Sequence, residues 1–335
     1  MKATKNENVV YILGAGFSAQ FGLPVMNNFL EKSKDMYAIK DELKYRIQTD
    51  IDFFKNVYSE IDKLRRCKDF YEADMTNIEE ILSLFDMGKI LGSESKSTLD
   101  FKKFISAVIK YYTPTEYRIG TYNDFEMFVE KLFRITKKHD PPYADHTLPH
   151  YSILSFNYDL LLESLLECFN KKYFGRQVLR YTTKLSEEPP REEVFLPYIK
   201  LHGTVDDPET IVPPTWHKLQ DEQNENWKFA GTLLMKANHI RIIGYSLPVT
   251  DNYLKYFLKW GAAHENNLKS IDVICLDDNN GTVKKRYRDF IHNKLNFFNK
   301  TTGEYLEEVK KGIEEAHEHL FLKSSKNTNN NTKTE

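Results

Sequence analysis

The fold is decided by residues 9–18, which read VVYILGAGFS. Val9 to Leu13 are five consecutive apolar residues, most of them β-branched or aromatic, and a glycine follows at once. A short apolar run bounded by a glycine is typical of a strand that is buried on both faces of a parallel sheet. The start of the chain therefore predicts an α/β fold.

The turn after this run has the pattern G-x-G-x-x-A, from Gly14 to Ala19. Glycines at these positions allow a tight turn and let backbone N–H groups approach a diphosphate. We expect a helix to begin at Ser18 and to run to about Phe21, before the break at residues 22–24. The acidic residue that dinucleotide-binding dehydrogenases place about 20 residues further on has no counterpart here, which disfavours a dehydrogenase. The pattern is short and common, so by itself it leaves the ligand open.

Strand-like runs return in the second half of the chain and alternate with helical patterns. The strands are expected at Ser152–Ser155, Tyr198–Leu201, Ile240–Ile243 and Ile271–Leu276, and the clearest helices at Asp159–Cys168 and Asn252–Trp260. Alternation of this kind is typical of a parallel sheet with helices on its faces. We therefore predict a Rossmann-like parallel sheet formed by residues 1–30 and 146–323.

The segment between these two parts, residues 31–145, is rich in helix-forming residues and predicts a large helical insertion. Its clearest signal is a capping box from Thr76 to Glu79, followed by apolar residues at helical spacing, which are Ile78, Ile81, Leu82 and Phe85. A second apolar run contains Phe125, Phe128, Val129, Leu132 and Phe133, and its spacing favours a helix core over a ligand site. The polar tail, residues 324–335, is expected to be disordered.

Composition excludes several classes of protein. The formal net charge of −2 gives no electrostatic support for binding nucleic acid or a membrane surface, and neither partner is expected. The cysteines, Cys67, Cys168 and Cys275, are far apart and suggest neither a disulfide framework nor a metal site. The N-terminus has no signal-peptide pattern, and no apolar run approaches the ~18 residues of a membrane span. A cytoplasmic protein is expected.

Polar residues follow two of the predicted strands, at the edge where open α/β sheets bind ligands. Asn157 and Asp159 lie in the sequence SFNYD, where Asx side chains also commonly cap the next helix. His202 follows the run ending at Leu201 and is a candidate general base, although a lone histidine beside a strand is more often structural.

Two further strand ends contribute candidates. The loop from Gly244 to Asp251 reads GYSLPVTD, and Gly244 and Ser246 could donate hydrogen bonds to a phosphate, while Thr250 or Asp251 could cap the next helix. Asp277 and its neighbours end the last predicted strand. A carboxylate there could accept hydrogen bonds from a ribose, and a solvated loop explains it equally well.

These motifs together resemble the sirtuin superfamily, and within it the bacterial branch found in antiphage defence. GAGFSAQFGLP resembles the opening GAGxS…GxP of that superfamily, SFNYD its N-x-D motif, KLHG its histidine–glycine pair, and GYSLPVTD the branch's version of the G-x-S loop. The sequence IVPPTW, with residues 227–231, is also similar to this branch. The resemblance covers about residues 8–30 and 150–280.

The resemblance implies that NAD is bound as a substrate and assigns roles to individual residues. Asn157 and His202 would be catalytic, and Asp159 would border the nicotinamide pocket. The diphosphate and the two riboses would be contacted by Gly14, Ala15, Gly16, Ser18, Gly244 and Ser246. Asp277, or alternatively Asn279, would contact the adenosine ribose.

The sequence departs from deacylating sirtuins at two places. It lacks the four cysteines of their zinc module, so no metal is expected, and its GLPVMNN stands where they have GIPDFR. Both departures disfavour protein deacylation. In the resembling branch, helical material commonly replaces the zinc module, in agreement with the insertion predicted above.

The function expected from these observations is hydrolysis of NAD+ to nicotinamide and ADP-ribose by an antiphage effector that depletes NAD when activated. The alternatives are an NAD-dependent deacylase and a non-catalytic module that binds NAD or ADP-ribose. Because unregulated NAD hydrolysis would harm the host cell, we expect control by homo-oligomerisation or by a partner defence protein, such as an ATPase or an Argonaute-like protein.

Overall fold

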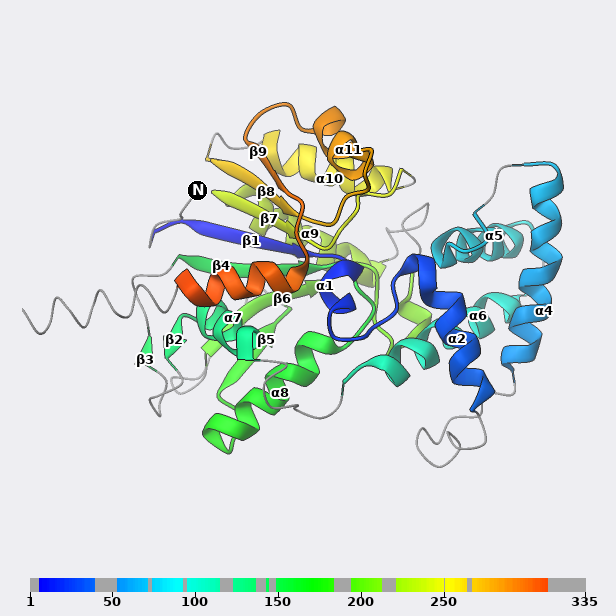
Figure 1. Cartoon of the computed structure of the whole chain (residues 1–335), viewed down its shortest axis with the longest axis horizontal. Coiled ribbons are helices and arrows are strands. Elements are labelled where there is room, and N and C mark those ends of the chain that lie inside the picture. The colour runs from blue at the N-terminus through cyan, green and yellow to red at the C-terminus, as the bar shows by residue number, and fades with distance from the viewer. Residues whose placement is uncertain are drawn as a thin grey trace, which may run out of the picture.

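A parallel sheet lies at the centre of the molecule in the computed structural model (Figure 1). The structure describes residues 6–39, 53–71, 74–92, 95–114, 123–136, 143–144, 149–183, 194–212, 221–249, 251–263 and 267–312. Within these residues the sheet has seven strands: β1 (Asn8–Leu13), β4 (His150–Ser155), β5 (Leu179–Thr182), β6 (Val194–Lys200), β7 (His239–Ile243), β8 (Ser270–Ile274) and β9 (Leu295–Phe298). Their order across the sheet is β5-β6-β4-β1-β7-β8-β9, and every neighbouring pair is parallel.

Strand β1 is buried on both faces, as its apolar run predicts. It pairs with β4 on one side and with β7 on the other. Because successive side chains of a strand point to opposite faces, Val9, Tyr11 and Leu13 pack into one hydrophobic core, and Val10 and Ile12 pack into a second one. The expected Rossmann-like α/β fold is confirmed.

The order of the strands places a ligand-binding crevice beside β1. The chain passes from β1 to β4, β5 and β6 on one side and then crosses to β7 on the other side. Six strands follow the Rossmann order 3-2-1-4-5-6, and β5 extends the edge beyond β6. The direction of winding reverses between β1 and β7, and open α/β sheets bind ligands at the carboxyl ends of the strands at such a reversal.

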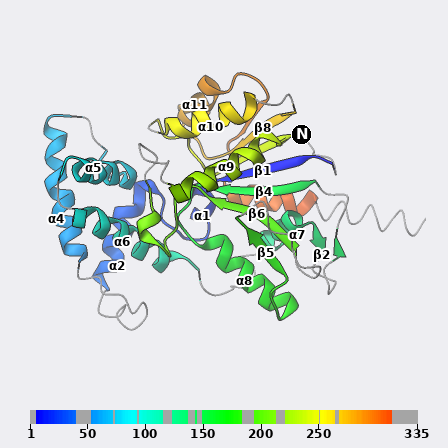
Figure 2. The ribbon, with the colours of Figure 1, turned by 180° about the vertical axis from the view of Figure 1, so that it is seen from behind.

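Helices cover both faces of the sheet (Figures 1 and 2). One face packs against α7 (Asn123–Phe133), α8 (Leu161–Phe174) and the helical residues 302–312, through Phe128, Leu165 and Leu306. The other face packs against α9 (Asp221–Met235), α10 (Asn252–Ala263) and α11 (Thr282–Phe290), through Ala230, Leu254 and Tyr287.

The predicted helical segment begins soon after β1 and lies beyond the carboxyl ends of the strands (Figure 1). After α1 (Ala15–Ala19) come η1 (Met26–Asn28), α2 (Phe29–Ala38), α4 (Phe54–Leu64), η2 (Arg65–Asp69), α5 (Ile78–Ile90) and α6 (Ser95–Tyr112). Aromatic rings join these helices; those of Phe54 and Phe104, for example, have centroids 4.7 Å apart. The later helix α7 contacts β4 and β6, and the short strands β2 (Ile135–Thr136) and β3 (Tyr143–Ala144) form an antiparallel pair.

Two local predictions are wrong. Helix α1 begins at Ala15 and not at Ser18, because the turn after β1 passes directly into a helix. Thr76 is not the cap of α5: the side chain of Asn77 accepts the backbone N–H groups of Glu79 and Glu80, and the Thr76 hydroxyl donates to Asp74 instead. The apolar positions of both predicted helices, including Ile81 and Phe128, are buried as expected.

Some predictions fall outside the described residues. They concern the tail at 324–335, Thr250, and the part of IVPPTW beyond Val212. Across the described part of the chain, no helix combines the length and the apolar character needed to cross a membrane.

Candidate functional site

The turns after β1 and β7 lie against each other at the strand reversal. The N–H group of Gly14 donates to the carbonyl oxygen of Ile243 at 2.9 Å, and that of Gly16 donates to the carbonyl oxygen of Gly244 at 2.8 Å. Gly244 has φ +66°, and a Cβ atom on it would lie 2.1 Å from the nitrogen of Phe17. Position 244 therefore requires glycine, because the two backbones are in contact there and leave no room for a Cβ atom.

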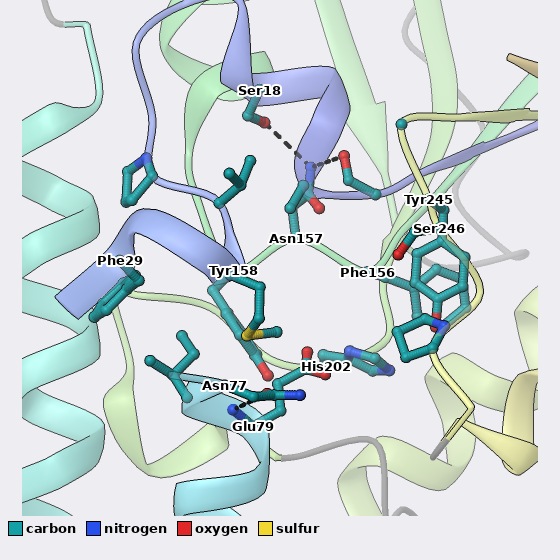
Figure 3. Close-up of a pocket in the computed structure, with 18 of the residues that line it drawn as sticks. Ser18, Phe29, Asn77, Glu79, Phe156, Asn157, Tyr158, His202, Tyr245 and Ser246 are labelled. Atoms are coloured by element: carbon teal, nitrogen blue, oxygen red, sulfur yellow. Dashed lines mark hydrogen bonds between the residues drawn. The ribbon is translucent and has the colours of Figure 1, made fainter. Parts of the chain in front are cut away.

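A cavity of about 410 Å³ opens beside these turns (Figure 3). Of the ten residues predicted to form the site, eight line it: Gly14, Ala15, Ser18, Asn157, Asp159, His202, Gly244 and Ser246. They come from the ends of the four strands β1, β4, β6 and β7 and from α1, which the sheet topology brings together. A cavity of this size at the strand reversal is suitable for a small ligand or for part of a dinucleotide.

The other two predicted residues are not among the described residues that line the cavity. Gly16 packs against the backbone of Gly244, and its N–H group is already bonded there. The carboxylate of Asp277 accepts the backbone N–H groups of Val283 and Lys284 at the beginning of α11. In this structure Asp277 therefore caps a helix.

Asn157 and Ser18 tie the loop after β4 to the turn after β1. The amide nitrogen of Asn157 donates to the carbonyl oxygen of Gly14 at 3.0 Å and to the Ser18 hydroxyl at 3.1 Å. The Ser18 hydroxyl in turn donates to Oδ2 of Asp159 at 2.7 Å. With Nδ2 held in this way, Oδ1 is the remaining hydrogen-bonding atom of the Asn157 amide, and it can accept a bond from a ligand.

Asp159 accepts a hydrogen bond at the start of α8 and also lies in the wall of the cavity. Its Oδ1 accepts the N–H of Leu161 at 3.0 Å at the start of α8, and its side chain lines the cavity. Burial raises the pKa of this carboxyl above the ordinary value, although the positive charge of Lys200 and the Ser18 hydroxyl act in the opposite direction. Lys200 also donates to the carbonyl oxygens of Tyr158 and Asp159 and pairs with Glu163. The loop is thus held by the lysine that ends β6.

His202 lies at the bottom of the site and is 1% exposed. Its ring stands edge-on to that of Phe156, with centroids 4.7 Å apart, and lies 6.2 Å from the ring of Tyr158. The backbone before it is bonded to β4, since Leu201 donates its N–H to Ser155. The rings of Phe156 and Tyr158 therefore pack around the imidazole.

The loop after β7 is held by Asp251. Its carboxylate accepts the Tyr245 hydroxyl, and its Oδ1 accepts the N–H of Leu254 at 3.0 Å. Of the two caps considered for α10, Asp251 is confirmed. This arrangement fixes the backbone that presents Gly244 and Ser246 to the cavity.

Several cavity residues were missed by sequence analysis. The beginning of α5 contributes Asn77, Ile78 and Glu79, and α11 contributes Arg286, whose guanidinium lies 3.5 Å from the carbonyl oxygen of Ser246. Apolar side chains complete the wall; they include Leu23, Phe29 and Ile109. The capping pattern of α5 was visible in the sequence, but its distance in the chain from the strand ends gave no sign that it reaches the same cavity.

A comparison with protein families matches residues 151–297 to the model of the SIR2-like domain. This part of the chain is similar to SIR2-like domains. The match begins in β4, ends in β9 and contains Asn157, Asp159, His202, Gly244 and Ser246. It confirms the resemblance to the sirtuin superfamily, whose members use NAD. No curated protein matches the chain.

The described part of the chain shows no group of side chains arranged as a metal centre. No three His, Cys, Asp or Glu side chains are grouped there so that they could hold an ion. Cys168 and Cys275, the two cysteines whose side chains are described, are unbridged.

Proposed function

We propose that the chain hydrolyses NAD+ at the bond between nicotinamide and ribose and releases nicotinamide and ADP-ribose. The supporting observation is that Asn157 and His202, which are far apart in the sequence, line one cavity together with the glycine turn after β1. The SIR2-like match over the same strands supports NAD as the substrate.

The lining of the cavity is chemically suited to NAD+. Arg286 supplies a cationic group beside Ser246, where a diphosphate would be stabilised. Leu23, Phe29 and Ile109 supply an apolar wall for an aromatic ring. Because the N–H groups of Gly14 and Gly16 are bonded to Ile243 and Gly244, Ala15 is the residue of this turn whose backbone N–H would contact the diphosphate.

The proposed reaction needs positioning more than a strong acid, because nicotinamide leaves as a neutral molecule from a cationic ring. Oδ1 of Asn157 would accept a hydrogen bond from a ribose hydroxyl or from the attacking water. His202 would accept the proton that the water loses as it bonds to the ribose carbon. The carbon–nitrogen bond breaks before the water bonds, and its electron pair stays on the nicotinamide nitrogen.

The test is release of nicotinamide from NAD+ by the purified chain and its variants. His202→Ala and Asn157→Ala are each expected to lower the rate by roughly 10²–10⁴-fold. His292→Ala is the matched control, because that histidine is exposed and outside the cavity. Unchanged release from the His202 variant would reject the assignment. Saturable NAD+ binding without turnover would favour a non-catalytic module, and NAD+-dependent deacylation of an acetyl-lysine peptide would favour a deacylase.

We further propose that this activity belongs to a cytoplasmic antiphage effector that depletes NAD when it is triggered. The proposal is supported by the resemblance of GYSLPVTD and SFNYD to the defence branch of the superfamily. Control would come from self-assembly or from a partner defence protein. Sedimentation of the active preparation tests this: a monomer with full activity on its own would contradict it.

A further inference from the structure

We infer that Glu79, at the beginning of α5, is a further catalytic residue, whose carboxylate faces the nicotinamide ribose and stabilises the positive charge that develops there. The inference rests on the proposed hydrolysis of NAD+. By this inference the helical segment that contains α5 both covers the site and takes part in the reaction.

The backbone of Glu79 is held in place by its own helix. Its N–H donates to Oδ1 of Asn77 at 2.9 Å, which fixes the first turn of α5. Ile78, Ile81 and Leu82 surround it in the sequence and are all buried in the core that α5 shares with the neighbouring helices. The turn therefore fixes the backbone from which the Glu79 side chain enters the cavity.

The side chain of Glu79 reaches into the cavity from the wall opposite the glycine turn. Figure 3 shows it directed toward His202 and Tyr158, while Asn157 and Ser18 lie on the far side of the same space. A ribose held between Asn157 and His202 would therefore meet the carboxylate of Glu79 on its open side.

The negative charge of Glu79 acts on two tyrosines of the site. Burial raises the pKa of Tyr158 and of Tyr245 well above the ordinary value, and the negative charge of Glu79 contributes to the rise at each of them. Both hydroxyls therefore remain neutral. Arg286, the cation that lines the described cavity, comes from α11 on the other side of the sheet's winding reversal. The cavity thus has an acidic wall on α5 and a basic wall on α11.

This separation of charge matches the charges of NAD+ and of the reaction. The diphosphate is anionic and the nicotinamide ring is cationic. As the bond between the ribose carbon and the ring nitrogen breaks, its electron pair moves to the ring, which becomes neutral, and the positive charge moves to the ribose carbon and its ring oxygen. Water then bonds to that carbon and gives one proton to His202. A carboxylate facing the ribose stabilises the charge in the transition state, and in a cavity this effect is large.

The first experiment compares turnover of NAD+ by Glu79→Gln and by Asp86→Asn. The glutamine has the same shape without the charge, so kcat is expected to fall by about 10²-fold while thermal unfolding is unchanged. Asp86 lies on the same helix outside the cavity, and its variant should retain the wild-type kcat within about twofold. If the wild type releases nicotinamide and Glu79→Gln does so equally fast, the role of Glu79 is rejected and the proposed hydrolysis stands.

The second experiment does not depend on turnover. In the His202→Ala background, calorimetry measures the affinities for NAD+ and for NADH, whose nicotinamide ring is neutral. Adding Glu79→Gln is expected to lower the ratio of NAD+ affinity to NADH affinity by roughly tenfold, because only the cationic ring is attracted by the carboxylate. An unchanged ratio would overturn the placement of Glu79 even in a preparation that shows no hydrolysis.

Discussion

The N–H group of Gly16 donates a hydrogen bond of 2.8 Å to the carbonyl oxygen of Gly244, and this bond joins the turn after β1 to the turn after β7. A Cβ atom on Gly16 would lie 2.8 Å from Cα of Gly244. The glycines of the N-terminal motif therefore support the contact between two strand ends, and the cavity forms on the surface that this contact creates.

Replacement of Gly244 by alanine is expected to destabilise the chain by more than about 3 kcal/mol, because strain at positive φ and a backbone collision add together. Gly175→Ala is the matched control. Gly175 also has a positive φ, of +64°, but a Cβ atom there meets nothing within 4 Å, so that variant should lose only about 1 kcal/mol. Urea unfolding measures both. Equal losses would show that the two turns do not need their close approach.

The buried carboxyl of Asp159 should make stability depend on pH. Burial raises its folded-state pKa above the ordinary 3.8, so the folded chain binds a proton at a pH where the unfolded chain has released it. Its contribution to the free energy of unfolding therefore decreases as pH rises from 3.8 through the folded pKa. The stability of the wild type relative to Asp159→Asn should therefore fall as pH rises above 3.8 and passes through the folded pKa.

Asp278→Asn is the control for that measurement. Hydrogen bonds from Thr282 lower the pKa of Asp278, so this carboxyl titrates below 3.8 in the folded chain. Its stability difference from the wild type should stay nearly constant over the same range of pH. A parallel behaviour of the two variants would contradict the buried environment of Asp159.

Tyr11 is expected to ionise at an unusually low pH. Burial by itself would raise the pKa of its phenol, but the positive charges of Arg241 and Lys131 outweigh burial and lower the pKa to about 8. Arg241 also donates to the Tyr11 oxygen at 2.9 Å. The difference in phenolate absorbance between the wild type and Tyr11→Phe should therefore show a titration near pH 8.

The same shift has a consequence for stability. Because the folded pKa of Tyr11 lies below the unfolded value of 10, ionisation stabilises the folded state. The stabilisation is complete above the unfolded pKa and is lost as pH falls through about 8. Tyr11→Phe should remove this increase. A wild-type phenol that titrates near pH 10 would disprove the arrangement around Arg241.

The cap of α5 distinguishes two neighbouring residues. Asn77→Ala removes the acceptor of two backbone N–H groups and should lower the free energy of unfolding by about 1 kcal/mol. Thr76 is exposed, and its N–H and hydroxyl groups donate to Asp74. Thr76→Ala should therefore change the free energy of unfolding by less than about 0.5 kcal/mol. If urea unfolding showed a larger loss of stability for Thr76→Ala than for Asn77→Ala, Thr76 would be the cap, as the sequence alone predicts.

The sequence by itself determined the elements whose signal is local. The run from Val9 to Leu13 and the glycine turn after it gave the central strand and the class of fold, because burial on both faces requires uninterrupted apolar residues. Asn157, His202 and Gly244 were recognised since each directly follows a strand-like run. Strands β5 and β9 were not predicted, because edge strands such as Leu295–Phe298 alternate between half-buried and exposed positions and lack a continuous apolar run. Helices α9 and α11 were not predicted either.

Only the tertiary structure decided which residues share the cavity. Glu79 is separated from the strand-end motifs by a long stretch of chain, and Arg286 lies in the helix that follows the last of them. No local pattern shows that either residue reaches the cavity; the packing of α5 and the position of α11 bring them there. Tertiary structure also gives Gly16 and Asp277 backbone hydrogen bonds that the sequence did not predict: Gly16 bonds to the turn after β7, and Asp277 bonds to the start of α11. The sequence motif sets the position of a residue at the end of a strand, and the tertiary structure sets which groups its side chain contacts.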